Sequence, residues 1–234
     1  MAKGVLVLLA HRWDATAQRL AEQWRPLGVR RMTPEDLSFP GWRLRVGDGE
    51  GMAVCGGDTL PTGRIGGVYS RMSRVYRDDL PHIVADDREY VAAEMNAFLA
   101  AWLAALPCPM LNRPRANSLS GPPWRQEQWL HAAAGLGIPV RPLRRRVERA
   151  GAVPAVEGER AEGGVRVTVV GGRTMGGGDE RLHGYARRLA RHAGVDLLAA
   201  RFAVDGAAGY LLAVDALPEV DEETGEAIGA YFAA

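Results

Sequence analysis

The sequence predicts an α/β protein, in which an α/β domain is followed by a smaller C-terminal domain of strands and helices. A continuous apolar run at residues 5–10 is typical of a strand that is covered on both faces, as in parallel sheets. A helical pattern follows this run and ends at Gly28, which begins an α/β unit. Beyond residue 164, three apolar strand patterns and two helical patterns follow.

The first α/β unit is expected to continue to Met32. Asp14 begins a helix that runs to Leu27, because apolar residues recur three and four apart on one face. Residues 29–32 then form a second strand. Between residues 33 and 62, Pro and Gly residues interrupt short alternations of apolar and polar residues, which predicts a hairpin or a meander.

A strand at residues 68–72 precedes the most regular helical pattern of the chain. The segment Asp86–Glu89 has the signature of a helix start, a side-chain acceptor followed three residues later by Glu. The apolar spacing continues to Leu106, and Pro107 ends the helix. A short strand is expected at residues 109–112, followed by a loop rich in Pro, Ser and Gly.

Residues 143–164 have a different composition and no hydrophobic period. We interpret this segment as a linker, which divides the chain into a first domain, residues 1–142, and a C-terminal domain, residues 165–234. The helix expected at Trp124–Leu136 falls in the first domain.

The C-terminal domain begins with a strand at residues 165–170. Gly171-Gly172 follows it and predicts a tight hairpin turn, since a positive φ there needs glycine. The glycines at 176–178 lack the Lys-Ser/Thr of a phosphate-binding loop, so they are expected to be a connector. The remaining helices and strands are expected at residues 179–193, 198–204, 210–215 and 222–232.

Composition and charge exclude several classes of function. A formal net charge of +1 argues against nucleic-acid binding, which usually needs a clustered basic face. No apolar run approaches the roughly 20 residues of a membrane span, and the first apolar run reads as a buried strand rather than a signal peptide. A disulfide between Cys55 and Cys108 is one alternative, but two thiols in a well-sized domain favour a reducing, cytoplasmic location.

Three segments, in this order, resemble the ATP-grasp ligases that modify ribosomal peptides or add amino acids to carboxylates. The helix ending at Leu106, together with residues 108–114 and 124–139, is similar to the passage from the preATP-grasp domain into the grasp. Residues 165–173 resemble the central strand pair, and residues 186–218 resemble the helix and the metal-binding hairpin. The resemblance implies a preATP-grasp-like α/β domain followed by a reduced ATP-grasp-like antiparallel sheet with helices.

The chain departs from this family where nucleotide would bind. Between Pro142 and Val165 the family places a lid with a phosphate-binding lysine and a Gly-rich flap, whereas this segment is short and Lys3 is the only lysine among 29 basic residues. Arginine does not replace a compact ammonium contact for contact. The resemblance therefore implies a truncated member in which residues 143–164 are a linker or the remnant of a lid.

The metal site implied by the resemblance is also reduced. The family supplies carboxylates from an acidic residue on the first hairpin strand and from a Glu-x-Asn pattern on the second. Arg201 and Ala213 occupy two of these positions here, and Asp215 occupies the third. Mg²⁺ needs carboxylate oxygens beside the phosphates, so Asp215 is the single remaining metal-ligand candidate.

Arginines lead the candidates for ligand binding. Arg166 matches the strand arginine that contacts an acyl phosphate in the family, and is otherwise a solvent-facing strand residue. Arg71 stands at a strand end, where ligands gather in α/β sheets, and is otherwise part of a surface ion pair. Five residues around the Pro-rich loop are candidates for lining a pocket: Asn112, Arg113, Trp124, Arg125 and Gln128.

Two functions from different classes remain. The favoured one is a non-catalytic accessory protein, without a cofactor, that holds a peptide, a carboxylate ligand or a partner enzyme in a biosynthetic system. The other is an active ATP-dependent carboxylate–amine ligase completed by a partner subunit, with ATP and Mg²⁺, in which Asp215 holds the metal and Arg166 and Arg173 contact phosphate or acyl phosphate. A homodimer is expected from the resemblance, because family members commonly pair. An unrelated α/β fold would be favoured if residues 165–215 did not form one antiparallel sheet.

Overall fold

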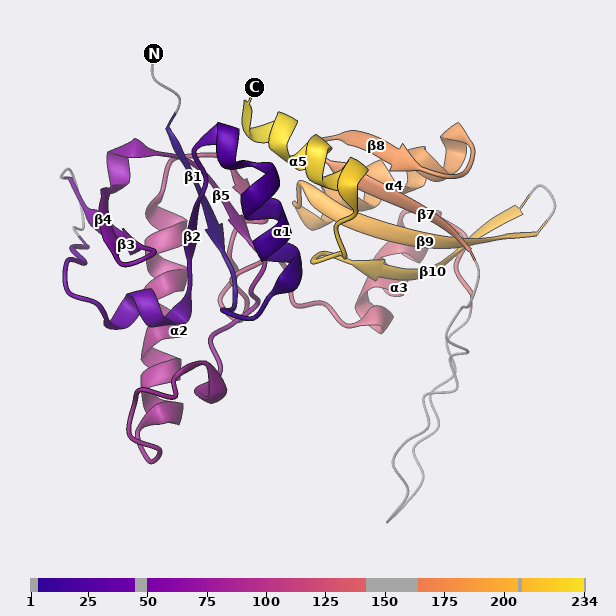
Figure 1. Ribbon diagram of the computed structural model, residues 1–234. Helices are drawn as coiled ribbons and strands as arrows, with labels where there is room; N and C mark the ends of the chain where they lie inside the picture. The colour runs from indigo at the N-terminus through magenta and orange to yellow at the C-terminus, as the bar shows by residue number, and fades with distance from the viewer. Residues whose placement is uncertain (1–3, 45–49, 142–163, 206–207, 234) are drawn as a thin grey trace, which may run out of the picture. The chain divides into compact units, whose positions relative to one another are not determined.

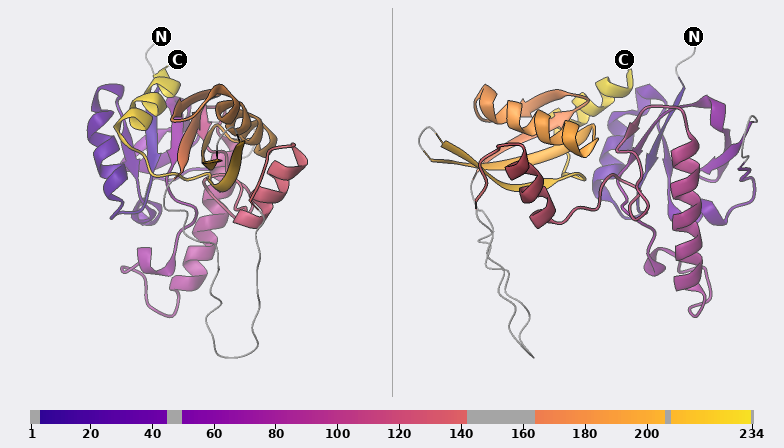
Figure 2. Two further views of the ribbon diagram at one scale, coloured as in Figure 1. Left: turned by 90° about the vertical axis from the view of Figure 1, so that its right-hand side faces the viewer. Right: turned by 180° about the vertical axis from the view of Figure 1, so that it is seen from behind.

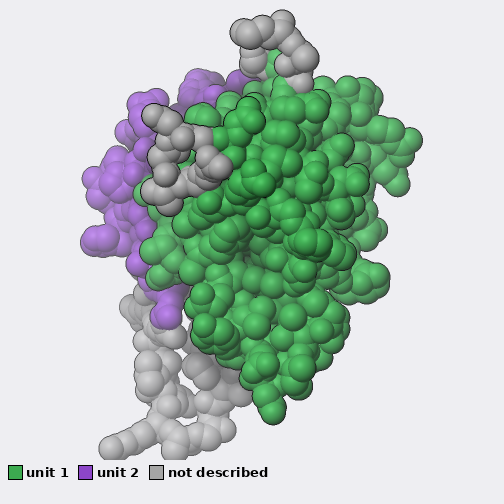
Figure 3. All heavy atoms as spheres, turned by 90° about the vertical axis from the view of Figure 1, so that its left-hand side faces the viewer, with its two compact units in different colours: residues 1–123, 219–234 green, residues 124–218 purple. Residues whose placement is uncertain are grey.

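Two four-stranded sheets organise the structure, one parallel and one antiparallel. The computed structural model describes residues 4–44, 50–141, 164–205 and 208–233 (Figure 1). The chain divides into two compact units, which Figure 3 shows in different colours. Unit 1 consists of residues 1–123 and 219–234, and unit 2 consists of residues 124–218.

Unit 1 is built on the parallel sheet, whose strand order is β2-β1-β5-β6. Its strands are β1 (Val5–Leu9), β2 (Arg30–Met32), β5 (Ile65–Ser70) and β6 (Met110–Leu111). The side chains of Leu6 to Leu9 are all buried, which confirms the predicted first strand. The other three strands confirm the predicted order, with bounds that differ by a few residues.

Helices cover both faces of this parallel sheet (Figures 1 and 2). α1 (Ala15–Gln23) and α5 (Glu222–Ala233) lie on one face, and α2 (Arg88–Ala105) lies on the other. Val7 and Trp102 share a buried cluster on the α2 side. Successive side chains of a strand point to opposite faces, so the continuous apolar run of β1 serves both helical layers.

Two glycines let α5 pack closely against α1 and β5 within unit 1. A Cβ atom at Gly225 of α5 would lie under 3.0 Å from the side-chain oxygen of Gln23. The indole N–H of Trp24 donates to the carbonyl oxygen of Gly225 at 3.0 Å. On β5, a Cβ atom at Gly67 would lie under 3.0 Å from the ring of Phe232. The close approach of α5 to α1 and β5 therefore depends on missing side chains at two positions.

The strands β3 (Met52–Cys55) and β4 (Asp58–Pro61) form an antiparallel hairpin. They lie in the segment 33–62, whose sequence pattern is irregular. Gly56 and Gly57 form its two-residue turn with φ of 64° and 82°, as primed hairpin turns require. The predicted hairpin is confirmed. Four short 3₁₀ segments complete the unit: η1 (Arg25–Leu27), η2 (Pro34–Ser38), η3 (Thr62–Arg64) and η4 (Arg77–Asp79).

Unit 2 is built on the antiparallel sheet, whose strand order is β10-β9-β7-β8. Its strands are β7 (Val165–Val170), β8 (Arg173–Gly176), β9 (Leu197–Asp205) and β10 (Ala208–Asp215). The helix α4 (Glu180–Ala193) begins at Asp179, whose side chain accepts from the amide of Leu182, and ends at Gly194 in the left-handed conformation. This single sheet confirms the predicted arrangement of residues 165–215.

The helix α3 (Gln126–Gly135) belongs to unit 2. Its residues Trp129, Leu130 and Ala133 are buried in one cluster with the sheet and α4. The side-chain amide of Gln126 donates to the carbonyl oxygen of Val214 at 2.7 Å and accepts from its N–H at 3.1 Å. Gln126 thus pairs with the backbone of β10 as a neighbouring strand would.

These units differ from the predicted domains at both boundaries. The predicted first domain includes residues 124–142, whereas α3 packs in unit 2 because its apolar face meets that sheet. The predicted C-terminal domain includes α5, whereas α5 packs against α1 and β5 in unit 1. The predicted linker at 143–164 lies, except for Gly164, outside the described residues.

Gly176 is expected to be essential for pairing β8 with β7. Its φ is +103°, and a Cβ atom there would lie under 3.0 Å from the carbonyl oxygen of Arg166. Gly176→Ala is therefore expected to destabilise this edge by about 2–4 kcal/mol, through backbone strain and a clash. The measurement is hydrogen exchange of the β7 amides. Gly172→Ala is the control, because its φ is +84° without any atom within 4 Å, so only about 1–2 kcal/mol of strain is expected; equal losses in both variants would contradict the clash.

Candidate functional site

The first candidate site is the face of the unit 2 sheet opposite α4, here called the distal face. Residues paired across antiparallel strands share a face of the sheet. The register places Arg166 of β7 opposite Arg201 of β9, and Arg201 opposite Ala213 of β10. Asp215 lies opposite Ala199, one pair further along on the same face. The sheet therefore brings together Arg166, Arg201 and Asp215, which are far apart in sequence.

Arginines outnumber carboxylates among the described side chains that the register places on the distal face. Directly opposed residues have Cβ atoms about 4.5–5.5 Å apart, and diagonal neighbours about 7–8 Å apart. Arg166 and Arg201 are directly opposed on β7 and β9, so their Cβ atoms have the shorter of these separations. Arg173, opposite Val170, adds a third arginine at the β7–β8 turn.

Asp215 has a local structural partner. Its Oδ1 accepts a hydrogen bond from the amide of Leu217 at 2.8 Å, and its side chain is exposed. It is the only carboxylate that the register places on the distal face among the described side chains. Within the described ranges, no group of three or more His, Cys, Asp or Glu residues could hold a metal ion. A divalent cation would meet one carboxylate here and two arginines.

Arg201 is a site residue that the predicted set of ligand-binding residues does not include. It stands where the family resemblance places an acidic residue, and its neighbour across the strand pair is Arg166. The Gly171-Gly172 turn fixes the register of β8 against β7. It does not fix the register of β9, because α4 separates β9 from this hairpin in the sequence. A sequence signal for the Arg166–Arg201 pair would have required the β7–β9 register.

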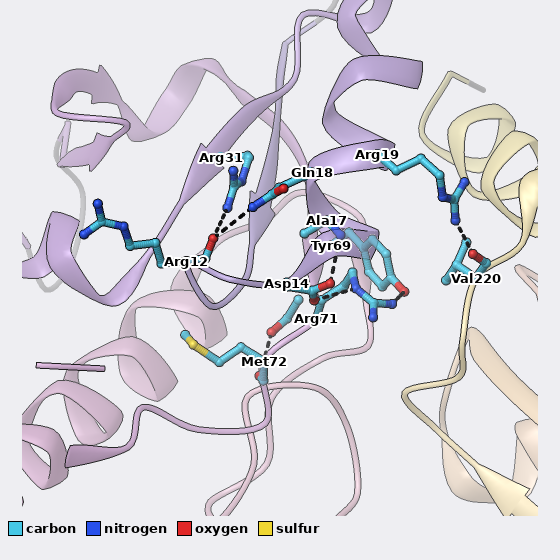
Figure 4. A network of polar contacts seen from close by, with 11 residues as sticks. Arg12, Asp14, Ala17, Gln18, Arg19, Arg31, Tyr69, Arg71, Met72 and Val220 are labelled. Carbon is cyan, nitrogen blue, oxygen red and sulfur yellow. Dashed lines mark hydrogen bonds and ion pairs between the residues drawn. The ribbon is translucent and has the colours of Figure 1, made fainter. Parts of the chain in front are cut away.

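The second candidate region is the carboxyl end of the parallel sheet in unit 1, where Arg71 follows β5. Its Nε donates to Oδ2 of Asp14 at 2.9 Å, and one terminal nitrogen donates to the hydroxyl of Tyr69 at 3.3 Å (Figure 4). The side chains of Arg71 and Asp14 are only 11% and 14% exposed. Oδ1 of Asp14 also accepts from the amide of Ala17 at 2.9 Å and so caps α1. Arg71 thus ties the end of β5 to the start of α1.

The surroundings of Arg71 change its pKa in opposite directions. Burial by itself lowers the pKa of Arg71, but the neighbouring Tyr69 and Asp14 raise it, and the net result is a raised pKa. Arg71 therefore stays charged, and its charge is already balanced by Asp14. The predicted alternative of an ion pair is present, in a largely buried form. Elsewhere in the same view, Arg19 donates to the carbonyl oxygen of Val220 and links α1 to the segment before α5 (Figure 4).

The five residues predicted around the Pro-rich loop do not lie in one unit. Asn112 and Arg113 belong to unit 1. Asn112 is buried, and Arg113 donates to the carbonyl oxygens of Leu106 and Cys108 at 3.4 and 3.0 Å. These carbonyls follow the last turn of α2, where basic side chains are favourable. Arg113 therefore holds the end of α2 in place.

Trp124, Arg125 and Gln128 belong to unit 2, at the start of α3. The indole of Trp124 makes an edge contact with Trp129, with ring centroids 4.6 Å apart. The side-chain oxygen of Gln128 accepts from the backbone N–H of Arg125 at 2.9 Å, which caps the helix. Two of these residues thus have identified structural roles, and Arg125 is exposed.

Both cysteines are buried free thiols in unit 1. Burial, with a smaller contribution from Asp36, raises the pKa of Cys55 to about 12. Burial also raises the pKa of Cys108. A thiol with a raised pKa is a poor nucleophile, so neither cysteine is suited to covalent catalysis.

The described helices include none that is long and apolar enough to cross a membrane.

The combination of a parallel α/β unit and an antiparallel sheet with helices is also the fold of solved ATP-grasp ligases. Three solved structures share it across nearly the whole chain. The macrocyclase MdnC bound with precursor peptide MdnA, from Microcystis aeruginosa MRC, has a TM-score of 0.71 and 13% sequence identity and covers 98% of this chain and 99% of its own. A ribosomal-peptide-associated (RiPP) ATP-grasp ligase of Chryseobacterium gregarium, in complex with ADP and a leader and core peptide, has a TM-score of 0.68 and 12% identity, with coverage of 98% and 96%.

The third structure is the ATP-grasp ligase PsnB complexed with minimal precursor, Mg and ADP. Its TM-score is 0.62 and its identity 16%, and the match covers 98% of each chain. No protein-family model and no curated protein matches this sequence. At these identities the likeness establishes the fold, and the fold supports many different functions.

Proposed function

We propose that this chain is a non-catalytic ATP-grasp-like protein that holds an acidic peptide, or another carboxylate ligand, in a peptide-modification system. The observation that carries the proposal is the set of residues on the distal face, where the register places Arg166 and Arg201 with Asp215 as the single described carboxylate. Arginine side chains on this face favour an anionic ligand, whereas a divalent cation needs several oxygen ligands and would find one carboxylate. The three solved structures of the same fold are complexes with peptides, which supports a peptide as the ligand.

The chemistry of phosphoryl transfer explains why catalysis is not proposed. Mg²⁺ demands near-octahedral oxygen ligands and neutralises the charge that develops on the transferred phosphoryl group. At the position opposite Arg201, Ala213 supplies no ligand. A nucleotide bound without the metal would keep its phosphates but would lack the charge neutralisation that the transfer requires.

The second function is an active ATP-dependent carboxylate–amine ligase completed by a partner subunit. It would use ATP and Mg²⁺, with Asp215 on the metal and Arg166 and Arg173 on phosphate or acyl phosphate. The presence of Mg and ADP in the PsnB complex favours this alternative. A truncated lid and a homodimer remain predictions from the family resemblance.

Calorimetric titration with a non-hydrolysable ATP analogue and Mg²⁺ separates the two functions. We expect no binding heat up to millimolar nucleotide, because one carboxylate holds Mg²⁺ poorly. Asp215→Asn keeps the oxygen that accepts from Leu217 and removes only the charge, and Asp58→Asn is the matched control on an exposed strand position. Micromolar binding that Asp215→Asn weakens at least tenfold, with Asp58→Asn unchanged, would favour the ligase and count against the non-catalytic proposal.

A further inference from the structure

A polar cavity of about 380 Å³ lies in unit 1, apart from the distal face and from the Arg71 ion pair. Its volume falls within the roughly 300–1,000 Å³ of small-molecule sites. We call it the Arg74–Arg115 pocket, after its two charged residues. The lining is completed by Ser73, Asn96, Ala100, Ala116, Asn117, Ser118 and Leu119.

The pocket lies between segments that follow neighbouring parallel strands. Ser73 comes three residues after the end of β5, and residues 115–119 come shortly after β6. β5 and β6 pair in parallel, so both loops leave the sheet at its carboxyl end. Ligands of open α/β sheets bind outside this end. The third wall is one face of α2, which contributes Asn96 and Ala100.

Hydrogen bonds hold the three walls together. The amide of Leu119 donates to the carbonyl oxygen of Ser73 at 2.8 Å. The side chain of Asn96 accepts from the amide of Val75 at 2.8 Å and donates to its carbonyl oxygen at 2.9 Å. Arg115 and Ser118 exchange backbone hydrogen bonds at 2.8 and 3.1 Å. The cavity is therefore a preformed site, which lowers the entropic cost of binding.

The charge of the lining is positive and has no internal counter-charge. No acidic residue lines the cavity. Within the described part of the chain, neither Arg74 nor Arg115 forms an ion pair, and the guanidinium of Arg74 lies 5.7 Å from the ring centre of Tyr76. Both arginines line the cavity and are exposed. Arg71 and Arg113, by contrast, already have partners among carboxylates and carbonyls.

The rest of the lining narrows the chemistry of the ligand. Arginine's planar fork matches the two oxygens of a carboxylate. Ser73 and Asn117 add hydrogen-bonding groups, while Ala100 and Leu119 offer an apolar wall suited to a short chain of methylene groups. A glutamate side chain combines these two parts.

We infer that the Arg74–Arg115 pocket binds the carboxylate of an aspartate- or glutamate-like ligand. The inference deepens the proposed function, and its peptide part rests on that function, but the carboxylate site stands on the cavity alone. It adds a carboxylate site in unit 1 to the distal face of unit 2, on which the proposed function rests.

The experiment uses free glutarate as the probe and follows the backbone amide resonances of Asn117, Ser118 and Leu119. We expect saturable shifts at these amides, because hydrogen bonds to charged groups are among the stronger polar contacts. Arg74→Gln and Arg115→Gln are each expected to weaken binding about tenfold. Arg64→Gln, which removes an exposed charge of the same unit outside the cavity, is expected to bind as the wild type does.

Three results would overturn the inference: no saturable shifts, glutarate binding that both pocket variants retain, or tighter binding of inorganic phosphate than of glutarate at equal ionic strength. A synthetic peptide with one glutamate, compared with its glutamine form, tests the peptide part. Glutarate binding through both arginines without peptide binding would support the pocket and count against the proposed function. Peptide binding that neither arginine variant weakens would support the proposed function and overturn the pocket.

Discussion

Asp14→Ala is expected to lower the free energy of unfolding by about 3–5 kcal/mol, because it leaves the charge of Arg71 largely buried without its partner. The same substitution removes the side-chain cap of α1, which by itself is worth about 1 kcal/mol. The two carboxylate oxygens serve the two roles separately, Oδ1 for the amide of Ala17 and Oδ2 for Nε of Arg71. The measurement is urea unfolding with the slope compared among variants.

Asp14→Asn is the control that separates these roles, since asparagine caps helices as well as aspartate does. It should cost less than Asp14→Ala, and the remaining loss reports the ion pair. Adding Arg71→Gln to Asp14→Asn should recover part of the stability, because the uncompensated charge is then gone. A loss of under about 1 kcal/mol in Asp14→Ala would show that Arg71 is well solvated without Asp14.

Trp129→Ala is expected to destabilise unit 2 by about 3–5 kcal/mol, since it empties a fully buried indole site. Trp129 is 2% exposed and lies in the cluster shared by α3, α4 and the antiparallel sheet. The expected signature is faster hydrogen exchange of the β7 and β9 amides, with the β1 and β5 amides unchanged. This pattern would place α3 energetically in unit 2.

Trp102→Ala is the matched control in unit 1, where Trp102 is 1% exposed in the cluster of α2 and the parallel sheet. It should accelerate exchange in β1 and β5 and leave β7 and β9 protected. Loss of protection in all four strands from either substitution would mean that the two units unfold as one cooperative body.

Local signals in the sequence predicted most of the helices and strands. The apolar run of β1 and the turn at Gly171-Gly172 depend on neighbouring residues only, and the structure confirms both. The predicted helix is shorter than expected: α1 ends at Gln23, and Gly28 ends the 3₁₀ segment that follows it. The domain boundaries depend on which sheet an apolar face meets. The apolar pattern of α3 is the same whichever sheet it packs on, so its assignment to unit 2 could not be read from the pattern.

The candidate site was less predictable, because side-chain partners are distant in sequence. Arg71 was a reasonable candidate by position, but its partner Asp14 lies 57 residues away. Arg113 carries the same charge as Arg115 two residues later, yet the guanidinium of Arg113 contacts backbone carbonyls, whereas Arg115 lines the cavity. Only the path of the loop after β6 distinguishes the two.

The position of α5 has a consequence for how the protein is made on the ribosome. Synthesis runs from the N-terminus, and domains commonly fold as they emerge. All of unit 2 must leave the ribosome before α5 does, because residues 124–218 precede it in the chain. Until then, β5 lacks the packing of Phe232 at Gly67, and the indole N–H of Trp24 lacks its acceptor, the carbonyl oxygen of Gly225. The N-terminal unit is therefore the last of the two to be completed, although its strands are translated first.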